Sequence, residues 1–432
     1  MRSISIIFII LITSYKHAIA QQWQTDAYPL HRAQQSLTDV IVHDIFSPPV
    51  AARIYTYTSM AAYEVACKSN KEYHSLYNQV KDFPNIPPPT QQVIASLAAV
   101  YAYMFIGKQL VYSEPDLQDS LNHILTWYKS KKLSHTLYNN SLIYGQQVAD
   151  SIAVWMNKDR YKETRKMRRY DFSKQEGKWI PTPPGYIAAI EPYWNKIRTI
   201  TLDSCNQFTP ISATPFNKGK ESTFYKQAYE VYNTGINLTT DQKFIASFWD
   251  CNPFAINTDG HLNFATKKIS PGGHWMCITA LVCQQTGADL VKSAAAYTMV
   301  SIGLFDAFIS CWDEKYRSNV IRPETYINAV IDENWRPFLQ TPPFPEYTSG
   351  HSVVSSASAK ILTYMFGDIA FDDDTEVNYG LPVRHFSSFT AASNEAAISR
   401  MYGGIHYLPS IQNGQTEGGQ VGEWVLRKIH LN

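Results

Sequence analysis

Apolar residues recur at the spacing of one helical face over most of the chain, whereas alternating strand patterns are scarce. In the last of four such stripes, Val148, Ile152 and Trp155 fall on the same face. The four stripes occupy residues 36–67, 91–106, 117–128 and 135–157. Together they predict about four helices, which is enough for one bundle. The pattern therefore indicates an all-α fold.

The helical pattern stops at residues 158–222 and returns from Asp241 to the end of the chain. Prolines prevent any long helix in the interrupted segment. They are Pro181, Pro183, Pro184, Pro192, Pro210 and Pro215. We therefore predict two four-helix-bundle-like halves with a long proline-rich crossover loop. The N-terminal bundle and this loop are expected to occupy residues 21–235, and the C-terminal bundle, which carries the candidate chemistry, residues 236–432.

The composition indicates a globular protein without a strong overall charge. The 432 residues are 45% hydrophobic and 17% charged, which suffices for one large core or two. With 38 Lys and Arg against 37 Asp and Glu, the formal net charge is +1. No global field directs the chain to nucleic acid or to an anionic membrane, so we expect no nucleic-acid partner. Any bound anion has to be held by a local cluster of cations.

Residues 1–20 have the organisation of a secretory signal peptide. Arg2 provides the positive start, residues 4–12 form a short apolar stretch, and residues 18–20 fit a small-x-small cleavage site. We expect the mature chain to begin at Gln21 and to be exported, either to the periplasm or out of the cell. A retained membrane anchor is the alternative, which the short apolar stretch and the cleavage site disfavour.

The most lipid-like window after this segment is residues 294–312, and Asp306 interrupts it. A buried helix of a bundle explains this window better than a transmembrane helix, so we expect no membrane span in the mature chain.

The chain has six cysteines, few for its length, and no C-x-x-C pair. They could form disulfides in an exported protein, but the sequence leaves their pairing open. Their spacing does not indicate a metal site. They are Cys67, Cys205, Cys251, Cys277, Cys283 and Cys311.

The first candidate anion-binding segment contains Lys315 and Arg322, seven residues apart. On one continuous helix this spacing of two turns places both cations on one face, where they can contact the same anion. Pro323 suits the first turn of a helix predicted over 324–330, which puts a helix N-terminus beside Arg322. For this segment alone, an ordinary pair of surface cations is the alternative.

The second segment is Ser349-Gly350-His351, ahead of a clear helix that runs to about Met365. Such a turn exposes backbone N–H groups at the positive end of the helix dipole. Gly350 lets an anion approach the backbone, and Ser349 adds a hydroxyl donor. His351 lies at the edge of this anion site, where it can exchange protons with the bound group. The alternative is a plain N-cap followed by a solvent-facing histidine.

The third segment contains Arg400 and His406, with the pair Gly403-Gly404 between them. Arginine offers a planar fork of donors to an oxyanion, and a neutral imidazole offers a lone pair to a Lewis-acidic centre. The glycine pair leaves room for a bulky group next to the backbone. A helix end with a buried histidine is the alternative.

The order of these segments is more specific than any one of them. Lys-x6-Arg-Pro, then Ser-Gly-His, then Ser-Arg-x5-His resembles the signature of the type 2 phosphatidic acid phosphatase and vanadium haloperoxidase superfamily. The segments 179–184, 191–194 and 273–275 resemble the soluble bacterial haloperoxidase branch. The resemblance covers most of the mature chain, and it implies a fold of two four-helix bundles.

The resemblance also implies a role for each residue of the signature. His406 would be the single protein ligand to vanadium, and His351 the acid–base residue, with Lys315 polarising the bound peroxide. Trp312 and Phe344 match aromatic positions that line the active site, and Asp313 resembles an acidic neighbour in bacterial members. The residues that would hydrogen-bond the vanadate oxygens are Lys315, Arg322, Ser349, Gly350 and Arg400. Phosphate has the same shape and can occupy the same site.

Two positions depart from the family pattern. Ser410 stands where the family usually has Asp, four residues after the vanadium-linked histidine, and Thr348 replaces the usual proline before Ser-Gly-His. In the phosphatases this carboxylate orients and activates the nucleophilic histidine. Its loss counts against phosphatase chemistry more than against vanadate binding.

Three functions fit these observations. The first is a vanadate-dependent haloperoxidase that oxidises halide, iodide or bromide in preference, with hydrogen peroxide to hypohalous acid. The second is a soluble exported phosphatase with a phosphohistidine intermediate at His406. The third is a non-catalytic oxyanion-binding protein, which the presence of both histidines disfavours. We expect a monomer or a small homo-oligomer.

Overall fold

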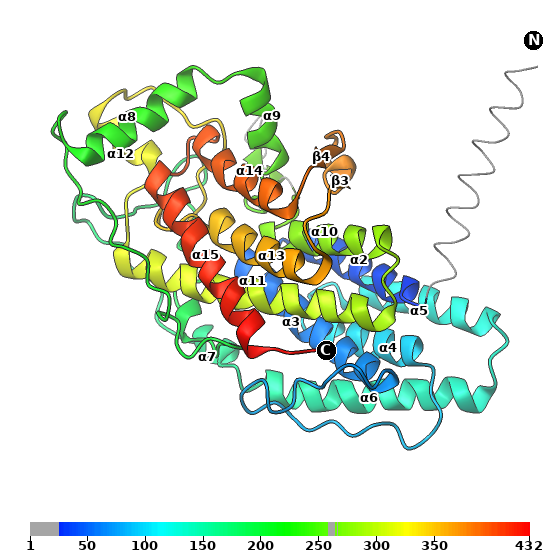
Figure 1. Ribbon diagram of the computed structural model, residues 1–432. Coiled ribbons are helices and arrows are strands. Elements are labelled where there is room, and N and C mark those ends of the chain that lie inside the picture. Colours follow the sequence, from blue (N-terminus) through cyan, green and yellow to red (C-terminus); the bar gives the residue numbers. More distant parts are fainter. Residues whose placement is uncertain (1–25, 258–263, 266) are drawn as a thin grey trace, which may run out of the picture.

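The computed structural model describes residues 26–257, 264–265 and 267–432. The predicted signal peptide, residues 1–20, lies outside the described residues. Helices dominate the described chain, as the periodicity predicted, and the strands form two small antiparallel pairs (Figure 1).

Five α-helices precede the crossover loop in the part of the N-terminal half that the structure describes. They are α2 (Tyr28–His43), α3 (Pro48–Ala66), α4 (Ala95–Lys108), α5 (Glu114–Ser130) and α6 (His135–Met156), with the 3₁₀ helix η1 (Cys67–Ser69) after α3. The stripe predicted over 36–67 was wrong as one helix, because the chain turns between α2 and α3. Ile45 has a positive φ of 56°, and Pro48 occupies the first turn of α3, where its missing N–H costs nothing.

The predicted crossover loop is confirmed. Between α6 and α8 (Thr223–Ile236), this fully described segment contains only the short helices α7 (Tyr161–Thr164) and η2 (Trp194–Lys196). Asp306, buried in the middle of a core helix, anchors the loop by accepting the N–H groups of Ile200 at 2.8 Å and Thr201 at 2.7 Å. The charged residue that interrupts the apolar window thus holds the crossover in place.

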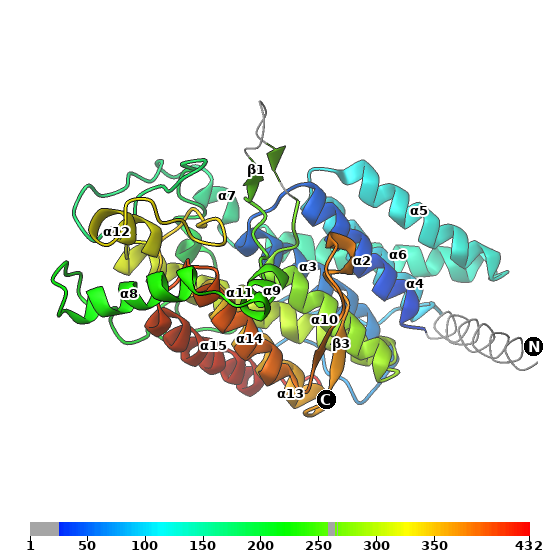
Figure 2. The ribbon, with the colours of Figure 1, turned by 90° about the horizontal axis from the view of Figure 1, so that it is seen from above.

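The C-terminal half contains the remaining helices and strands. They are α9 (Thr240–Phe248), β1 (Ile256–Asn257), β2 (Phe264–Ala265), α10 (Pro271–Gln285), α11 (Leu290–Ser318), α12 (Pro323–Val330), α13 (Gly350–Phe366), β3 (Phe371–Asp373), η3 (Val377–Tyr379), β4 (Arg384–Phe386), α14 (Phe389–Tyr402) and α15 (Leu408–Lys428). Strand β1 pairs with β2, and β3 with β4. In both ribbon views, α8 and α12 lie at one end of the molecule and α5 near the other (Figures 1 and 2).

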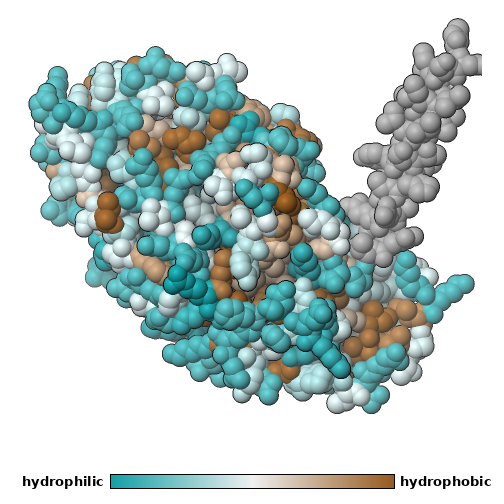
Figure 3. Space-filling view, in the orientation of Figure 1, coloured by the Kyte–Doolittle hydropathy of each residue, from teal (hydrophilic) through white to brown (hydrophobic). Residues whose placement is uncertain are grey.

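Helix α11 forms the centre of the core. It packs against α3 of the N-terminal half and against α10, α13 and α15 of its own half. From Leu290 to Lys315 every residue except Lys292 is buried. By length and composition α11 alone among the described helices could cross a membrane, but its apolar window is wholly buried, as predicted for a core helix. Hydrophilic residues cover much of the surface in Figure 3, with small apolar patches between them.

Candidate active site

The three predicted segments converge at one end of the core. In the first segment, Lys315 lies near the C-terminal end of α11 and Arg322 at the start of α12. The second segment begins α13, and the third runs from Arg400 in the last turn of α14 to His406 just before α15. Arg322 Nη1 is 3.2 Å from His406 Nε2, which joins the first segment to the third. The Ser349 N–H donates to the Ser410 carbonyl at 3.2 Å, which joins the second segment to α15.

Lys315 and Arg322 do not share a helix face, so the spacing argument was wrong. Helix α11 ends at Ser318, and Asn319 adopts the left-handed conformation with φ 52°. Arg322 is instead the N-cap residue of α12, the helix predicted to start at Pro323. The helix ends between the two cations, and both still lie over the Phe344 ring, Lys315 Nζ at 5.1 Å and Arg322 Cζ at 5.0 Å from its centroid.

Backbone carbonyls hold both arginines and leave part of each guanidinium unpaired. Arg322 donates through Nε to the Phe344 carbonyl at 2.8 Å and through Nη1 to the Ile405 carbonyl at 2.9 Å. Arg400 donates through Nη1 to the Trp249 carbonyl at 2.6 Å. Arg322 Nη2 and Arg400 Nε are buried and have no partner among the described residues. Burial lowers the pKa of Arg322 to about 10, and it remains a cation at neutral pH.

Lys315 shapes the turn in front of α13. Its buried ammonium donates to the carbonyls of Pro345 at 3.1 Å, Glu346 at 3.0 Å and Thr348. Burial, with a smaller effect of Arg322, lowers the pKa of Lys315 to about 8. Because all three ammonium protons have carbonyl partners, a bond from Lys315 to an oxyanion requires one of these contacts to open. Its predicted contact with vanadate stays a prediction.

The start of α13 has the form that the Ser-Gly-His motif predicted. Ser349 is the N-cap residue, and its Oγ accepts the Ser352 N–H at 3.4 Å, which leaves the hydroxyl proton for another acceptor. A Cβ added at Gly350 would lie 3.5 Å from the Trp312 ring, in the space that an approaching anion needs. His351 Nε2 is buried without a partner among the described residues. Burial, and then Arg400, lower the pKa of His351 well below its ordinary value, so the ring is neutral.

His406 has a carboxylate partner that the sequence analysis missed. Its Nδ1 lies 2.8 Å from Glu346 Oε1, and the same oxygen accepts the Tyr407 N–H at 3.0 Å. Ser410 Oγ is 3.4 Å from Nδ1, a long contact. Glu346 therefore occupies the role that the usual Asp four residues after the histidine would fill. The sequence contained a sign of this contact, because Glu346 is an acidic residue in an apolar run three residues before Ser349.

This pairing fixes the state of the His406 ring. Burial, reinforced by Arg322 and other nearby cations, lowers the pKa of His406 well below its ordinary value. With the proton on Nδ1 facing Glu346, Nε2 accepts from Arg322 Nη1 at 3.2 Å, so its lone pair can bind another group only when this contact opens. Burial raises the pKa of Glu346 to about 7, although Arg322 and Lys315 oppose this.

A cavity opens onto Gly350, His351, Arg400 and His406. Lys315, Arg322 and Ser349 are not among the described residues that line it. Trp312 and Phe344 lie in its wall, whereas Asp313 is not among the described residues that line it. The carboxylate of Asp313 instead accepts the Asn195 side-chain amide at 2.8 Å and lies 3.5 Å from Cys205 Sγ. The lining residues are Pro48, Cys251, Asn252, Pro253, Phe254, Pro271, Phe308, Trp312, Pro342, Phe344, Gly350, His351, Arg400, Ile405 and His406.

The space beside the glycine pair is filled by the protein itself, which corrects the expectation that a ligand uses it. A Cβ at Gly403 would lie 2.7 Å from the Leu339 side chain. Gly404 has a positive φ of 75°, and Pro337 and Trp335 pack against it. The pair lets the chain turn from α14 to His406.

The donors around this cavity fit a tetrahedral oxyanion. Arg322 Nη2 and Arg400 Nε are buried donors without partners, and unpaired donors of this kind are costly unless a ligand accepts from them. The Nε2 lone pair of His406 suits a Lewis-acidic central atom. The residues present therefore fit vanadate, which the two arginines, the start of α13 and His406 would hold.

Comparisons with known proteins agree with this geometry. Residues 295–431 match the family described as the VCPO second helical-bundle domain. The crystal structure of the first bacterial vanadium-dependent iodoperoxidase is 47% identical, with a TM-score of 0.88, and the match covers 94% of this chain and 97% of that one.

More distant structures share the fold. A holo-type bacterial vanadium-dependent chloroperoxidase is 16% identical, with a TM-score of 0.64, over 89% of this chain and 94% of that one. The apo-type structure of a bacterial vanadium-dependent chloroperoxidase is 14% identical, with a TM-score of 0.65, over 88% and 95% of the two chains. No curated protein matches this chain. On the match to the iodoperoxidase, the chain belongs to the vanadium-dependent haloperoxidases, which are peroxidases, as its motifs predicted.

Proposed function

We propose that this chain binds vanadate and uses hydrogen peroxide to oxidise iodide or bromide to hypohalous acid. The observation that carries the proposal is the His406 ring, which Glu346 orients so that Nε2 faces Arg322. Arg322 and Arg400 each keep an unpaired buried donor. Bound vanadate supplies a Lewis acid that activates peroxide and need not change its oxidation state.

The side chains have separate tasks in this reaction. Arg322 and Arg400 offset the negative charge of the oxyanion, because both are buried cations with free N–H groups. The neutral His351 can accept the proton that hydrogen peroxide loses, because its Nε2 has no other partner. Lys315 holds the turn before α13 through its backbone carbonyls and adds a positive charge next to this turn.

Iodide and bromide suit the wall of the cavity better than smaller halides. Trp312 packs against Phe344 with ring centroids 4.9 Å apart, and Phe308 packs on Trp312 at 5.3 Å. An apolar wall favours a large, weakly hydrated anion, whose desolvation costs least. The 47% identical relative is named an iodoperoxidase, which supports the same choice.

A phosphatase remains the second candidate, and one observation favours it. The Glu346 carboxylate contacts His406 Nδ1 and so replaces the carboxylate that is absent at position 410, where the chain has Ser410. The His406 ring is therefore oriented as a nucleophile would need. In that case His406 attacks phosphorus, and His351 protonates the leaving group. Phosphate would then occupy the place of vanadate.

One set of assays separates these functions. The mature chain is supplied with orthovanadate, and peroxide-dependent oxidation of iodide, bromide and chloride is followed in parallel with hydrolysis of para-nitrophenyl phosphate without vanadate. The proposal predicts halide oxidation, fastest with iodide. Hydrolysis without halide oxidation would identify a phosphatase. A rise in Tm with vanadate but neither activity would leave a non-catalytic oxyanion-binding protein.

We also propose that the protein acts outside the cytoplasm after cleavage near Ala20. The proposal rests on the signal-like organisation of residues 1–20. Mass spectrometry of protein from the secreted or periplasmic fraction should give an N-terminus at Gln21. Full-length protein found only in the cytoplasm would contradict it.

A further inference from the structure

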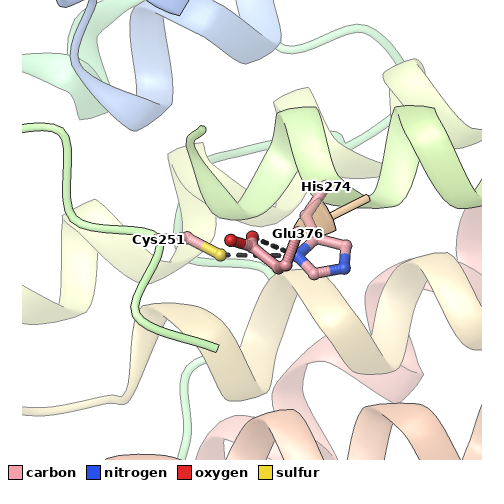
Figure 4. Close-up of side chains that lie close together, drawn as sticks. All are labelled: Cys251, His274 and Glu376. Atoms are coloured by element: carbon pink, nitrogen blue, oxygen red, sulfur yellow. Dashed lines mark hydrogen bonds and ion pairs between the residues drawn. The ribbon is translucent and has the colours of Figure 1, made fainter. Parts of the chain in front are cut away.

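Three side chains with metal-binding chemistry meet beside the active-site cavity. Cys251 follows α9, His274 lies in the first turns of α10, and Glu376 lies between β3 and η3 (Figure 4). All three residues are buried, and one ligand atom of each lies within 4.8 Å of the others. The cysteine spacing did not indicate a metal site, because the three groups come from distant parts of the chain.

The distances between the three ligand atoms are compatible with a shared ion. His274 Nδ1 is 3.5 Å from Cys251 Sγ and 3.3 Å from Glu376 Oε1. Only the contact to Glu376 is longer than an ordinary N–H to oxygen hydrogen bond of about 2.7–3.2 Å. In tetrahedral zinc sites, with Zn–S near 2.3 Å and Zn–N and Zn–O near 2.0–2.1 Å, the ligand atoms lie about 3.5 Å apart for S and N and about 3.3 Å for N and O.

Asp373 gives His274 the orientation that a metal ligand needs. Its Oδ2 lies 2.7 Å from His274 Nε2, and its other oxygen accepts the Thr375 N–H at 3.0 Å. With the proton on Nε2 facing Asp373, the Nδ1 lone pair points to Cys251 and Glu376, as Figure 4 shows for the ring. Metal-binding histidines commonly donate their second N–H to a carboxylate in this way.

The charges and the types of ligand atom in this cluster indicate which metal ion it would bind. A thiolate, an imidazole and a carboxylate form a mixed donor set that suits Zn²⁺. The thiolate and the Glu376 carboxylate balance the two positive charges of the ion, and the Asp373 carboxylate adds one negative charge beside His274. Although burial opposes it, the Asp373 carboxylate raises the pKa of His274 well above its ordinary value. Metal binding therefore releases two protons to solvent, one from the Cys251 thiol and one from His274 Nδ1.

We propose that Cys251, His274 and Glu376 bind one Zn²⁺, with Asp373 orienting the histidine and water in the fourth position. The ion would join the end of α9, the start of α10 and the β3–β4 hairpin. Cys251 lines the active-site cavity, and Trp249, two residues earlier, stacks on His274 with centroids 4.6 Å apart. Because the Trp249 carbonyl holds Arg400, the zinc would stabilise one wall of the active site.

The test measures metal content and coordination in the full mature chain. The chain is incubated with Zn²⁺ and desalted, and zinc and vanadium are measured together by mass spectrometry, so that metal at His406 is counted separately. We expect about one Zn²⁺ per chain, at least tenfold less in Cys251→Ser and His274→Gln, and no change in Cys283→Ser. Cys283 is the matched control because it is equally buried but packs against Ala288 and Ala296.

A cobalt titration keeps the test decisive if a variant folds poorly. Co²⁺ added to the metal-free wild-type chain should produce thiolate-to-cobalt absorption and the visible bands of a tetrahedral site, and Zn²⁺ should remove both. Wild-type chain that retains no zinc and gives no thiolate band would overturn the proposal, as would a band that persists in Cys251→Ser. The cluster would then be a protonated His274 between two carboxylates.

Discussion

Replacing Glu346 by glutamine tests how His406 is held. Glu346 Oε1 accepts both the His406 ring N–H and the Tyr407 N–H. The glutamine carbonyl can accept the same two bonds, so Glu346→Gln preserves the shape of the site and removes its negative charge. The variant therefore isolates the electrostatic part of the contact.

The expected loss of vanadate affinity follows from the type of contact that Glu346→Gln removes. A buried hydrogen bond to a charged group contributes about 1.5–3 kcal/mol. Carboxylates that orient a ligating histidine change metal affinity about 10–100-fold, which is about 1.4–2.7 kcal/mol. We therefore expect the Kd for vanadate to rise about 10–100-fold in Glu346→Gln.

The assay is a vanadate titration followed by the rise in Tm, with iodide oxidation measured on the same samples. Ser410→Ala is the matched control, because its hydroxyl is 3.4 Å from the same nitrogen, and it should change the Kd less than about threefold. Adding Ser410→Asp to Glu346→Gln should recover part of the affinity. Wild-type affinity in Glu346→Gln, or an equal loss in Ser410→Ala, would refute this account of His406.

Three further changes have expected outcomes. His406→Ala should abolish both the vanadate-dependent rise in Tm and halide oxidation, and an active variant would contradict the assigned site. Burial raises the pKa of Glu417 from 4.5 to about 7, so its carboxyl contributes stability below pH 4.5 that is lost as the pH rises through 7. This change in the free energy of unfolding is at most about 3 kcal/mol. Glu417→Gln should therefore flatten the dependence of the free energy of unfolding on pH, measured by urea unfolding between pH 5 and 7 without vanadate. Asp306→Ala leaves the buried N–H groups of Ile200 and Thr201 unpaired and should lower the free energy of unfolding by about 3 kcal/mol or more, whereas an unchanged urea midpoint would show that the crossover loop is anchored elsewhere.

Local signals in the sequence predicted much of the fold and the site. Proline in the first turn and serine at the N-cap marked the starts of α12 and α13, because both depend only on neighbouring backbone groups. The three signature segments came together as their order predicted. The apolar window around Asp306 proved to be a core helix, since its one charge has partners in the crossover loop.

Features that depend on distant partners could not be predicted. The relative position of Lys315 and Arg322 depends on the end of α11 at Ser318 and the left-handed Asn319, which helical spacing does not encode. Glu346 reaches His406 across 60 residues, whereas the sequence argument considered only the position four residues after the histidine. The cluster around His274 joins three segments whose spacing matches no short motif.

The central claim is that this chain is a vanadate-dependent haloperoxidase whose cofactor is held at His406. The most direct measurement is the initial rate of iodide oxidation at fixed hydrogen peroxide as orthovanadate is added to metal-free mature chain. We predict a rate that rises from background and saturates at about one vanadium per chain, and no such rise in His406→Ala. A rate that stays at background with saturating vanadate, or that rises equally in His406→Ala, would contradict the claim.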